Sequence, residues 1–337
     1  MPQLGNVGEF NGIGYWQSGN VWSALAIRDQ LTGSQTNKAQ VVNNLKLVFK
    51  LRKNYDQFGW WATAALYAHK AYNDIELLNN AIATWESVSQ FVVSPSDAQQ
   101  NKHPLKNFAL AGTCDGVTMA GGVFWRPTSD DTAINSITTG LYFTLSAYLA
   151  EVTKQSKYTD AAILSAKWII LHNLNDKNIV LDTVSGSNCQ RSPSNWIFTY
   201  NSGKFIEGLS VLTDVTGDKQ WETQMINTLA AAVKNTAWQG TDGIITEGSD
   251  NSTNNDGIGF KAVFIRGLLE AFRRTPENTN LRILIHSYID VQYNALLDLA
   301  KTNNFYSANW KGPAPTQFTS WGQLAALDVL VSAVEAN

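Results

Sequence analysis

Carboxylate side chains precede several helical patterns in this sequence, and they are the groups best suited to acid–base chemistry. Asp56 begins an apolar helical stretch, so its carboxylate can cap that helix by accepting a backbone N–H. The positive end of the helix dipole favours the ionised carboxylate and lowers its pKa. An ionised carboxylate suits a nucleophile or the stabilisation of an oxocarbenium ion, so Asp56 is the first catalytic candidate.

The adjacent acids Asp130 and Asp131 are a second candidate. They precede a helical pattern from Thr132 to Val152, where acids commonly cap a helix or interact with its dipole. As a like-charge pair, they would raise one of their two pKa values, which suits a general acid. Both interpretations stay open from sequence. Further acids in polar loops are Asp115, Glu247 and Asp256.

Aromatic residues are abundant: the chain has 12 Trp, 11 Tyr and 14 Phe. Trp and Tyr combine an apolar face with a polar handle, which suits amphipathic ligands such as sugars. The alternative role for each of these rings is packing in the core. The indoles that we consider as stacking surfaces are Trp60, Trp61, Trp125 and Trp310.

Composition and charge exclude several classes of protein. The net charge of -3 gives no electrostatic footprint for nucleic acid, and no apolar run approaches the ~20 residues that span a bilayer. Two cysteines without a CxxC and four isolated histidines predict no metal site, and we expect no cofactor. A lone GxGxxA string at 257–262 lacks the βαβ pattern of a dinucleotide site.

Cys114 and Cys189 either form a disulfide between loops or are two unrelated buried thiols. Asn251 begins a glycosylation sequon in a polar loop. Low charge, few lysines and abundant Asn, Ser and Thr favour a secreted protein. We therefore expect an extracellular mature chain without its signal peptide, with association to a cell wall as a further expectation.

Apolar side chains at three- and four-residue spacing predict eleven helices. Their approximate ranges are 20–31, 39–49, 57–73, 75–92, 131–153, 157–172, 200–216, 219–236, 259–274, 278–301 and 318–335. Strand-like alternation is confined to 122–125 and 243–247. Because no linker divides the chain, we predict a single domain over residues 1–337. Six polar loop-to-helix junctions predict an all-α (α/α)6 barrel with a cleft at one end; an open helical solenoid is the alternative.

Several segments, in order from about residue 54 to 330, resemble glycoside hydrolase family 76, the endo-α-1,6-mannanase-like proteins. Asp56-Gln57-Phe58-Gly59-Trp60-Trp61-Ala62 is similar to the family's Asp-Asp-x-Gly-Trp-Trp-Ala. The other similar segments contain Gly121-Gly122-Val123-Phe124-Trp125, Asn135 to Phe143, Thr199-Tyr200-Asn201-Ser202-Gly203, Phe260-Lys261-Ala262, Trp310-Lys311-Gly312-Pro313 and Ala325 to Asp328.

The resemblance implies an (α/α)6 barrel and retaining cleavage or transfer at α-1,6-mannosidic bonds by two consecutive aspartates. Without a gap, Asp56 takes the nucleophile position and Gln57 replaces the second aspartate, the acid/base. A shift of one residue instead places Tyr55 and Asp56 at the two positions, but it breaks the Gly-Trp-Trp match. Asp130 and Asp131 are the candidates for a displaced acid, and Asp115, Glu247 and Asp256 are alternatives.

The sequence thus predicts a carbohydrate-active enzyme with Asp56 as its main carboxylate. The competing hypotheses are a non-catalytic glycan-binding protein and a different reaction on the same barrel, with Tyr55 or Tyr200 as the base. We expect an oligo- or polysaccharide as partner, no nucleic acid, no membrane span and a monomer. The residues predicted to bind substrate are Tyr55, Gln57, Trp60, Trp61, Trp125, Asn135, Tyr200, Asn201, Glu247, Lys261 and Trp310.

Overall fold

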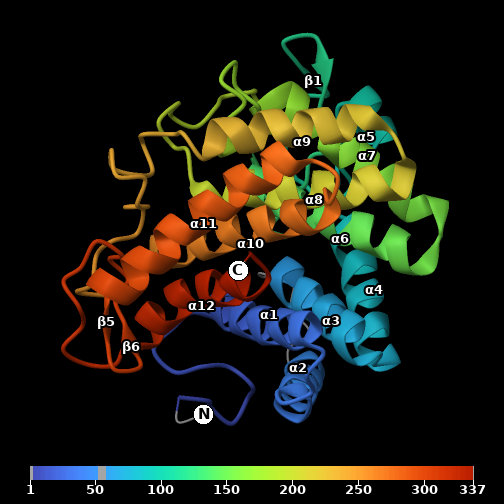
Figure 1. The fold of residues 1–337 in the computed structure, drawn as a ribbon. Helices are drawn as coiled ribbons and strands as arrows, with labels where there is room; N and C mark the ends of the chain where they lie inside the picture. Colours follow the sequence, from blue (N-terminus) through green and yellow to red (C-terminus); the bar gives the residue numbers. More distant parts are fainter. Residues whose placement is uncertain (1–2, 52–57, 337) are drawn as a thin grey trace. The chain divides into compact units, whose positions relative to one another are not determined.

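The computed structural model describes residues 3–51 and 58–336, and helices make up most of this part of the chain (Figure 1). Tyr55, Asp56 and Gln57, which carry the central catalytic prediction, lie outside the described residues. The α-helices are α1 (Tyr15–Thr32), α2 (Lys38–Leu51), α3 (Phe58–Tyr72), α4 (Ile75–Ser89), α5 (Pro95–Gln100), α6 (Ser136–Thr153), α7 (Ser156–Trp168), α8 (Thr199–Thr216), α9 (Lys219–Ala232), α10 (Asp256–Arg274), α11 (Thr279–Leu299) and α12 (Ser320–Ala336).

Three two-stranded antiparallel ladders and one π-helical turn complete the described secondary structure. The turn η1 (Ile169–Asn173) continues α7. The ladders pair β1 (Thr113–Cys114) with β2 (Val117–Thr118), β3 (Ala133–Asn135) with β4 (Thr183–Ser185), and β5 (Lys301–Thr302) with β6 (Phe305–Tyr306). The fold class predicted from the sequence, all-α, is confirmed.

Two kinds of helix alternate along much of the chain, and their sequences explain the difference. In α6, small and apolar residues surround the helix, and nearly every side chain from Ser136 to Ala150 is buried. In α2, only Val41, Leu45 and Val48 are buried, at spacings of three and four residues. A helix that is apolar all round belongs inside a protein, whereas a helix with one apolar stripe covers its surface.

The eleven predicted helices are all present, but the predicted start of one is wrong. The pattern over 131–153 does not begin at the acids, because Ala133–Asn135 forms strand β3 and α6 begins at Ser136. Asn135 caps α6 by accepting a hydrogen bond from the Thr138 backbone N–H at 3.1 Å. Asp131 instead accepts from the Ala133 N–H at 2.8 Å, so this acid stabilises the turn before the strand.

The two segments with strand-like alternation form isolated bridges rather than strands. Val123 pairs with Val92, Phe124 with Ile134, and Ile245 with Gln239. Each segment forms backbone bridges at only one or two of its residues, which is too few for a continuous β-ladder. The short helix α5 was not predicted; Ser94 caps it and Pro95 opens it.

The contacts divide the chain into two compact units, which we describe separately. The first unit comprises residues up to 53, 60–81 and 233–337, and the second comprises 54–59 and 82–232. The single domain over 1–337 stays a prediction. No helix in residues 3–51 or 58–336 has the length and apolar character needed to cross a membrane.

In the first unit, α10 and α12 pack against each other and α12 packs against α1 (Figure 1). A buried arginine joins the three helices: Arg266 donates from Nε and Nη2 to Asp328 at 2.9 and 2.8 Å, and from Nη1 to Asn20 Oδ1 at 2.7 Å. Removal of either charged partner would leave an uncompensated buried charge, so we expect the loss of Arg266 or Asp328 to destabilise the packing of these helices.

In the second unit, α6 is the central helix and packs against α7 and α8. Lys204 and Glu207 form a fully buried ion pair on α8, with Nζ and Oε2 2.7 Å apart. The Tyr148 hydroxyl on α6 donates to Glu207 Oε1 at 3.2 Å. The carboxylate therefore accepts from both helices, which satisfies a charge that would otherwise be costly to bury.

Candidate functional site

The second unit contains a cavity of about 520 Å³, and polar residues and two tryptophans are among those that line it. Strands β3 and β4, the loop 186–193 that follows β4, and the start of α8 line it. Trp125, Asn135 and Tyr200, which were predicted from the sequence, all line this one cavity. Asp182 and Trp196 line it too and were not predicted.

The β3–β4 ladder sets the positions of the side chains on one wall. Ala133 pairs with Ser185 and Asn135 with Thr183, and all four residues line the cavity. Because Asn135 also caps α6, its side chain is fixed between the strand and the helix. The helix start and the strand end therefore meet at the cavity wall.

A disulfide attaches the loop after β4 to the first hairpin of the unit. Cys114 in β1 is bonded to Cys189, so the disulfide alternative from the sequence is confirmed. Beside it, Arg191 Nη2 lies 3.4 Å from Asp115 Oδ2, and Arg191 Nη1 donates to the carbonyl of His172. This cross-link and these contacts hold the loop that forms the outer wall of the cavity.

Asp182 is the buried carboxyl group of the cavity, with 8% of the residue exposed. Asn201 Nδ2 donates to its Oδ1 at 3.1 Å, and Thr183 Oγ1 donates to its Oδ2 at 2.9 Å. Burial raises the pKa of this carboxyl, and the two hydrogen bonds oppose the rise only in part. A carboxyl with a raised pKa can hold a proton and can hydrogen-bond a hydroxyl as donor or acceptor.

The side-chain oxygen of Asn201, which lies beside the Asp182 carboxyl, is an unsatisfied hydrogen-bond acceptor within the described part of the chain. Its Nδ2 is used by Asp182, while its buried Oδ1 has no hydrogen-bond partner among the residues that the structure describes. Buried polar atoms nearly always have a partner, so this oxygen is an exception that lies directly behind the Asp182 carboxyl. Asn201 was predicted to bind substrate, and its contact with Asp182 places it next to the cavity.

Two indoles give the cavity rim apolar faces. Trp125 is 46% exposed and Trp196 is 49% exposed, which is unusual for the largest aromatic side chain. The Arg126 guanidinium stacks on Trp125, with its central carbon 4.0 Å from the ring centroid. Indole faces beside hydroxyl, amide and carboxyl groups match the alternating apolar and polar surfaces of a sugar.

In the first unit, the structure brings together three other predicted residues, but their contacts are internal. Lys261 is fully buried, and its Nζ donates to the carbonyls of Glu247 at 3.0 Å, Gly248 at 3.5 Å and Ala308. The ammonium lies 4.6 Å from the centroid of the buried Trp310 ring. Burial lowers the pKa of Lys261 to about 7, and Glu247 acts in the opposite direction.

Lys261 therefore holds two loops together, and the Trp310 ring packs against it. Both side chains are buried, and their roles in substrate binding stay predictions. Glu247 is partly buried at the end of one of these loops. Its role in substrate binding stays a prediction.

Trp60 and Trp61 also pack inside the first unit. Trp61 is fully buried beside Tyr15, with ring centroids 4.9 Å apart, and Trp60 lies 5.1 Å from Trp16. The Trp16 indole donates to Asp256 Oδ1 at 2.7 Å, so this acid is part of the aromatic cluster. Both tryptophans pack against other aromatic rings in this structure, and their role in substrate binding stays a prediction.

Asp130 is exposed and Asp131 is partly exposed in the loop before β3. Both carboxylates raise the pKa of Lys106, against the larger lowering caused by burial. Their catalytic role stays a prediction, as do the roles of Tyr55, Asp56 and Gln57. Residues 3–51 and 58–336 contain no group of three or more His, Cys, Asp or Glu side chains placed to hold a metal.

Comparison with known proteins identifies the family of this chain. The model of glycosyl hydrolase family 76 matches residues 3–336. Mannan endo-1,6-alpha-mannosidase DCW1 of Saccharomyces cerevisiae is 28% identical over 236 residues, which are 65% of this chain and 50% of that protein. The chain thus spans about half the length of this relative.

Solved structures show the same fold. An inactive variant of the alpha-1,6-mannanase GH76A of Salegentibacter sp. HEL1_6, in complex with alpha-1,6-mannotetrose, has a TM-score of 0.82 at 18% identity, covering 99% of this chain and 95% of that one. Dfg5 from Chaetomium thermophilum, in complex with glucosamine, has a TM-score of 0.73 at 18% identity, covering 96% and 81%. These likenesses support the barrel class predicted from the sequence.

Proposed function

Because this chain belongs to glycosyl hydrolase family 76, we propose that it is a carbohydrate-active enzyme that hydrolyses or transfers α-glycosidic bonds. The proposed substrate is an α-1,6-linked mannan or mannooligosaccharide. Two similar proteins support this substrate class: the Saccharomyces cerevisiae relative is a mannan endo-1,6-alpha-mannosidase, and the inactive variant of the Salegentibacter alpha-1,6-mannanase was solved in complex with alpha-1,6-mannotetrose.

The observation that carries the proposal is the cavity with a buried carboxyl below two exposed indoles. Asp182, Trp125 and Trp196 line it together, and its remaining wall is rich in hydroxyl and amide groups. Such a wall hydrogen-bonds neutral sugar hydroxyls, and the indoles stack on the apolar faces of the rings. We propose that sugar units of the substrate bind here.

Cleavage of a glycosidic bond uses two carboxyl groups, about 5–5.5 Å apart in a retaining enzyme and about 6.5–9.5 Å apart in an inverting one. Asp56 is our proposed ionised carboxylate. Asp182 joins the proposal as a second carboxyl group of the site, because burial raises its pKa and so favours its protonated form, as a general acid requires. Asp182 then either protonates the leaving oxygen or binds a hydroxyl of the reacting sugar.

The environment of the protein is part of the same proposal. A disulfide between Cys114 and Cys189 is typical of proteins that fold in an oxidising compartment. We therefore propose a secreted monomer that acts on extracellular glycan, without a cofactor.

The test is incubation of the protein with α-1,6-mannooligosaccharides and α-mannan, with products identified by mass spectrometry. We expect shorter or transferred oligosaccharides from the wild type, and a kcat/KM reduced by about 10²-fold or more in Asp182→Asn. Asp160→Asn changes an exposed acid on α7 and should keep full activity. No product from any α-mannan, or full activity in Asp182→Asn, would contradict the proposal.

The role of the indoles has its own test. Trp196→Ala should raise KM for a long oligosaccharide about tenfold, because one lost stacking face costs about 1–1.5 kcal/mol. The kcat should change much less, since Trp196 is proposed to bind sugar and not to transfer a proton. An unchanged KM for every chain length would remove this indole from the binding surface.

A further inference from the structure

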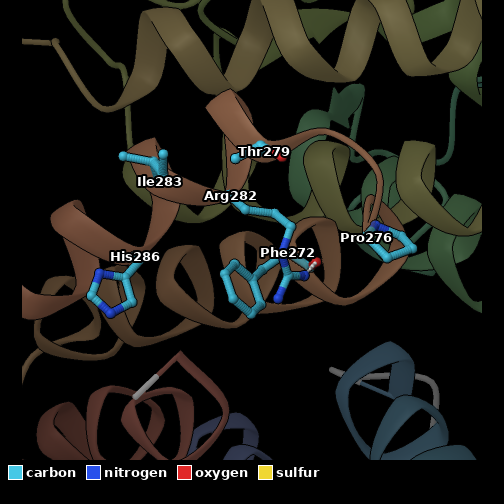
Figure 2. Close-up of a pocket in the computed structure, with 6 residues that line it drawn as sticks. All are labelled: Phe272, Pro276, Thr279, Arg282, Ile283 and His286. Carbon is cyan, nitrogen blue, oxygen red and sulfur yellow. Dashed lines mark hydrogen bonds between the residues drawn. The ribbon is translucent and has the colours of Figure 1, made fainter.

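A second hollow lies in the first unit, where α10 ends and α11 begins. It has a volume of about 380 Å³ and is lined by Phe272 of α10, Pro276 of the connection and four residues of α11. Figure 2 shows Phe272 and Arg282 at its centre, between His286 on one side and Pro276 on the other. None of these residues belongs to the proposed glycan site.

The four α11 residues form one face of the helix. Thr279, Arg282, Ile283 and His286 follow each other at spacings of three, one and three residues, which places them on adjacent turns of the same side. The outer face of a surface helix usually carries polar side chains, and an apolar face is usually covered by another part of the protein. Here it combines a guanidinium, an imidazole and a hydroxyl with an isoleucine that is 58% exposed.

Arg282 is held in a fixed orientation. Its guanidinium carbon lies 3.6 Å from the centroid of the Phe272 ring, and its Nη1 donates to the Phe272 carbonyl. No carboxylate among residues 3–51 and 58–336 forms an ion pair with Arg282, so its other N–H groups are not committed to an anion of the protein itself. A planar guanidinium fixed on a ring is pre-organised for bidentate binding of a carboxylate or phosphate.

The other lining groups complete a site for a small organic molecule. His286 Nδ1 lies 3.2 Å from Asp290 Oδ2, so Asp290 orients the imidazole and leaves Nε2 for a ligand. Ile283 and the exposed Pro276 supply apolar surface beside the guanidinium. The six lining residues include no carboxylate that would repel an anion.

We propose that this hollow binds a small organic anion, with its carboxylate or phosphate on Arg282 and its apolar part against Ile283 and Pro276. This site is separate from the proposed glycosidase function and does not depend on it. Its ligand is defined by one acid group joined to a compact apolar body, such as a phenyl ring.

The experiment is isothermal titration of the full chain with phenyl phosphate and benzoate as probes, and with benzyl alcohol and inorganic phosphate as comparisons. We expect both organic anions to bind at least tenfold more tightly than benzyl alcohol and inorganic phosphate. Equal affinity for benzyl alcohol would overturn the role of the acid group. Equal affinity for inorganic phosphate would overturn the role of the apolar part, and no binding of either probe would overturn the site.

Variants separate this site from binding elsewhere. Arg282→Met should weaken both probes at least tenfold, while Arg28→Met, which changes a half-exposed arginine on α1, should leave them unchanged. Ile283→Ser changes an exposed side chain and keeps Arg282 on its ring, so it should weaken phenyl phosphate several-fold while the protein stays folded. Unaltered binding in both Arg282→Met and Ile283→Ser would contradict the proposal.

Discussion

Each unit of the molecule contains a buried lysine that binds backbone carbonyls instead of a carboxylate. In the second unit, Lys106 donates to the carbonyls of Arg126 at 2.9 Å and Thr128 at 2.7 Å, and lies 4.4 Å from the Phe124 ring. In the first unit, Lys261 donates to three carbonyls above the Trp310 ring. Both lysines stabilise loops by donating to main-chain carbonyls. Such contacts cannot be recognised from a sequence motif, because every residue has a carbonyl.

The two lysines differ in how far they are removed from water and from acids. Lys106 retains 7% of its surface, and two nearby carboxylates, Asp130 and Asp131, raise its pKa. Lys261 retains none, and Glu247 alone raises its pKa. The comparison shows that the same contact costs more desolvation in the first unit. Water is correspondingly less able to replace Lys261 as the donor to its carbonyls, so we expect the first-unit loops to depend more strongly on their lysine.

The largest expected effect is that of Lys261→Met. The substitution keeps an unbranched chain of similar length but leaves buried carbonyls without a donor and removes the cation above Trp310. We expect a loss of about 3 kcal/mol in the free energy of unfolding, measured by urea titration. Lys301→Met, at an exposed lysine, is the control and should change stability by less than about 0.5 kcal/mol. An equally small loss of stability in both variants would contradict the role proposed for Lys261.

The second prediction concerns pH. The folded-state pKa of Lys261 is about 7, below its ordinary value of 10.5, so the folded chain binds fewer protons than the unfolded chain between these values. The stability of the wild type relative to Lys261→Met should therefore increase from pH 7 to 10.5, and it should stay at its lowest value, without further change, below pH 7. The slope should not exceed about 1.4 kcal/mol per pH unit. A flat difference over this range would show that the buried ammonium keeps its proton.

Lys106→Met should have a smaller effect, a loss of about 1–2 kcal/mol. Two carbonyls lose a charged donor, but the loop lies near the surface and water can replace part of the contact. Urea titration measures the loss, with the exposed Lys167→Met as the matched control. A loss as large as that of Lys261→Met would mean that burial does not distinguish the two lysines.

The smallest expected effect is that of Asp130→Asn combined with Asp131→Asn. The amides remove the charges that raise the pKa of Lys106, while the Asn side chain at 131 can still accept from Ala133. Stability should change by less than about 0.5 kcal/mol. The same double variant tests the catalytic prediction for these acids, because a strong loss of activity on α-mannan would support it and full activity would exclude it.

The helices were predictable because their apolar spacing is local. The start of α6 was not: the acids at 130 and 131 resemble a helix start, but strand β3 forms there because Ala133–Asn135 pairs with the distant β4. The pairing of β3 with a strand far along the chain cannot be predicted from the spacing of apolar residues within one segment. The cap, Asn135, was present in the sequence and was assigned only to substrate binding.

The candidate site was predicted in part. Trp125, Asn135 and Tyr200 line one cavity, as short motifs suggested. Asp182 was missed because it stands alone between Leu181 and Thr183, and its significance comes from burial and from Asn201, which only the fold creates. The apolar residues before Asp182 were the available signal, because an acid that follows such residues tends to be buried.

The bond between Cys114 and Cys189 closes a covalent ring over a sequence separation of 75. That ring includes β3, α6, α7 and β4, so it encloses the helical centre of the second unit as well as the cavity loop. A host cell that keeps thiols reduced would yield a chain whose central helices form but whose 186–193 loop is tethered only by noncovalent contacts. Glycan assays therefore call for a preparation in which this bond has formed, and a thiol titration reports its formation where circular dichroism of the helices would not.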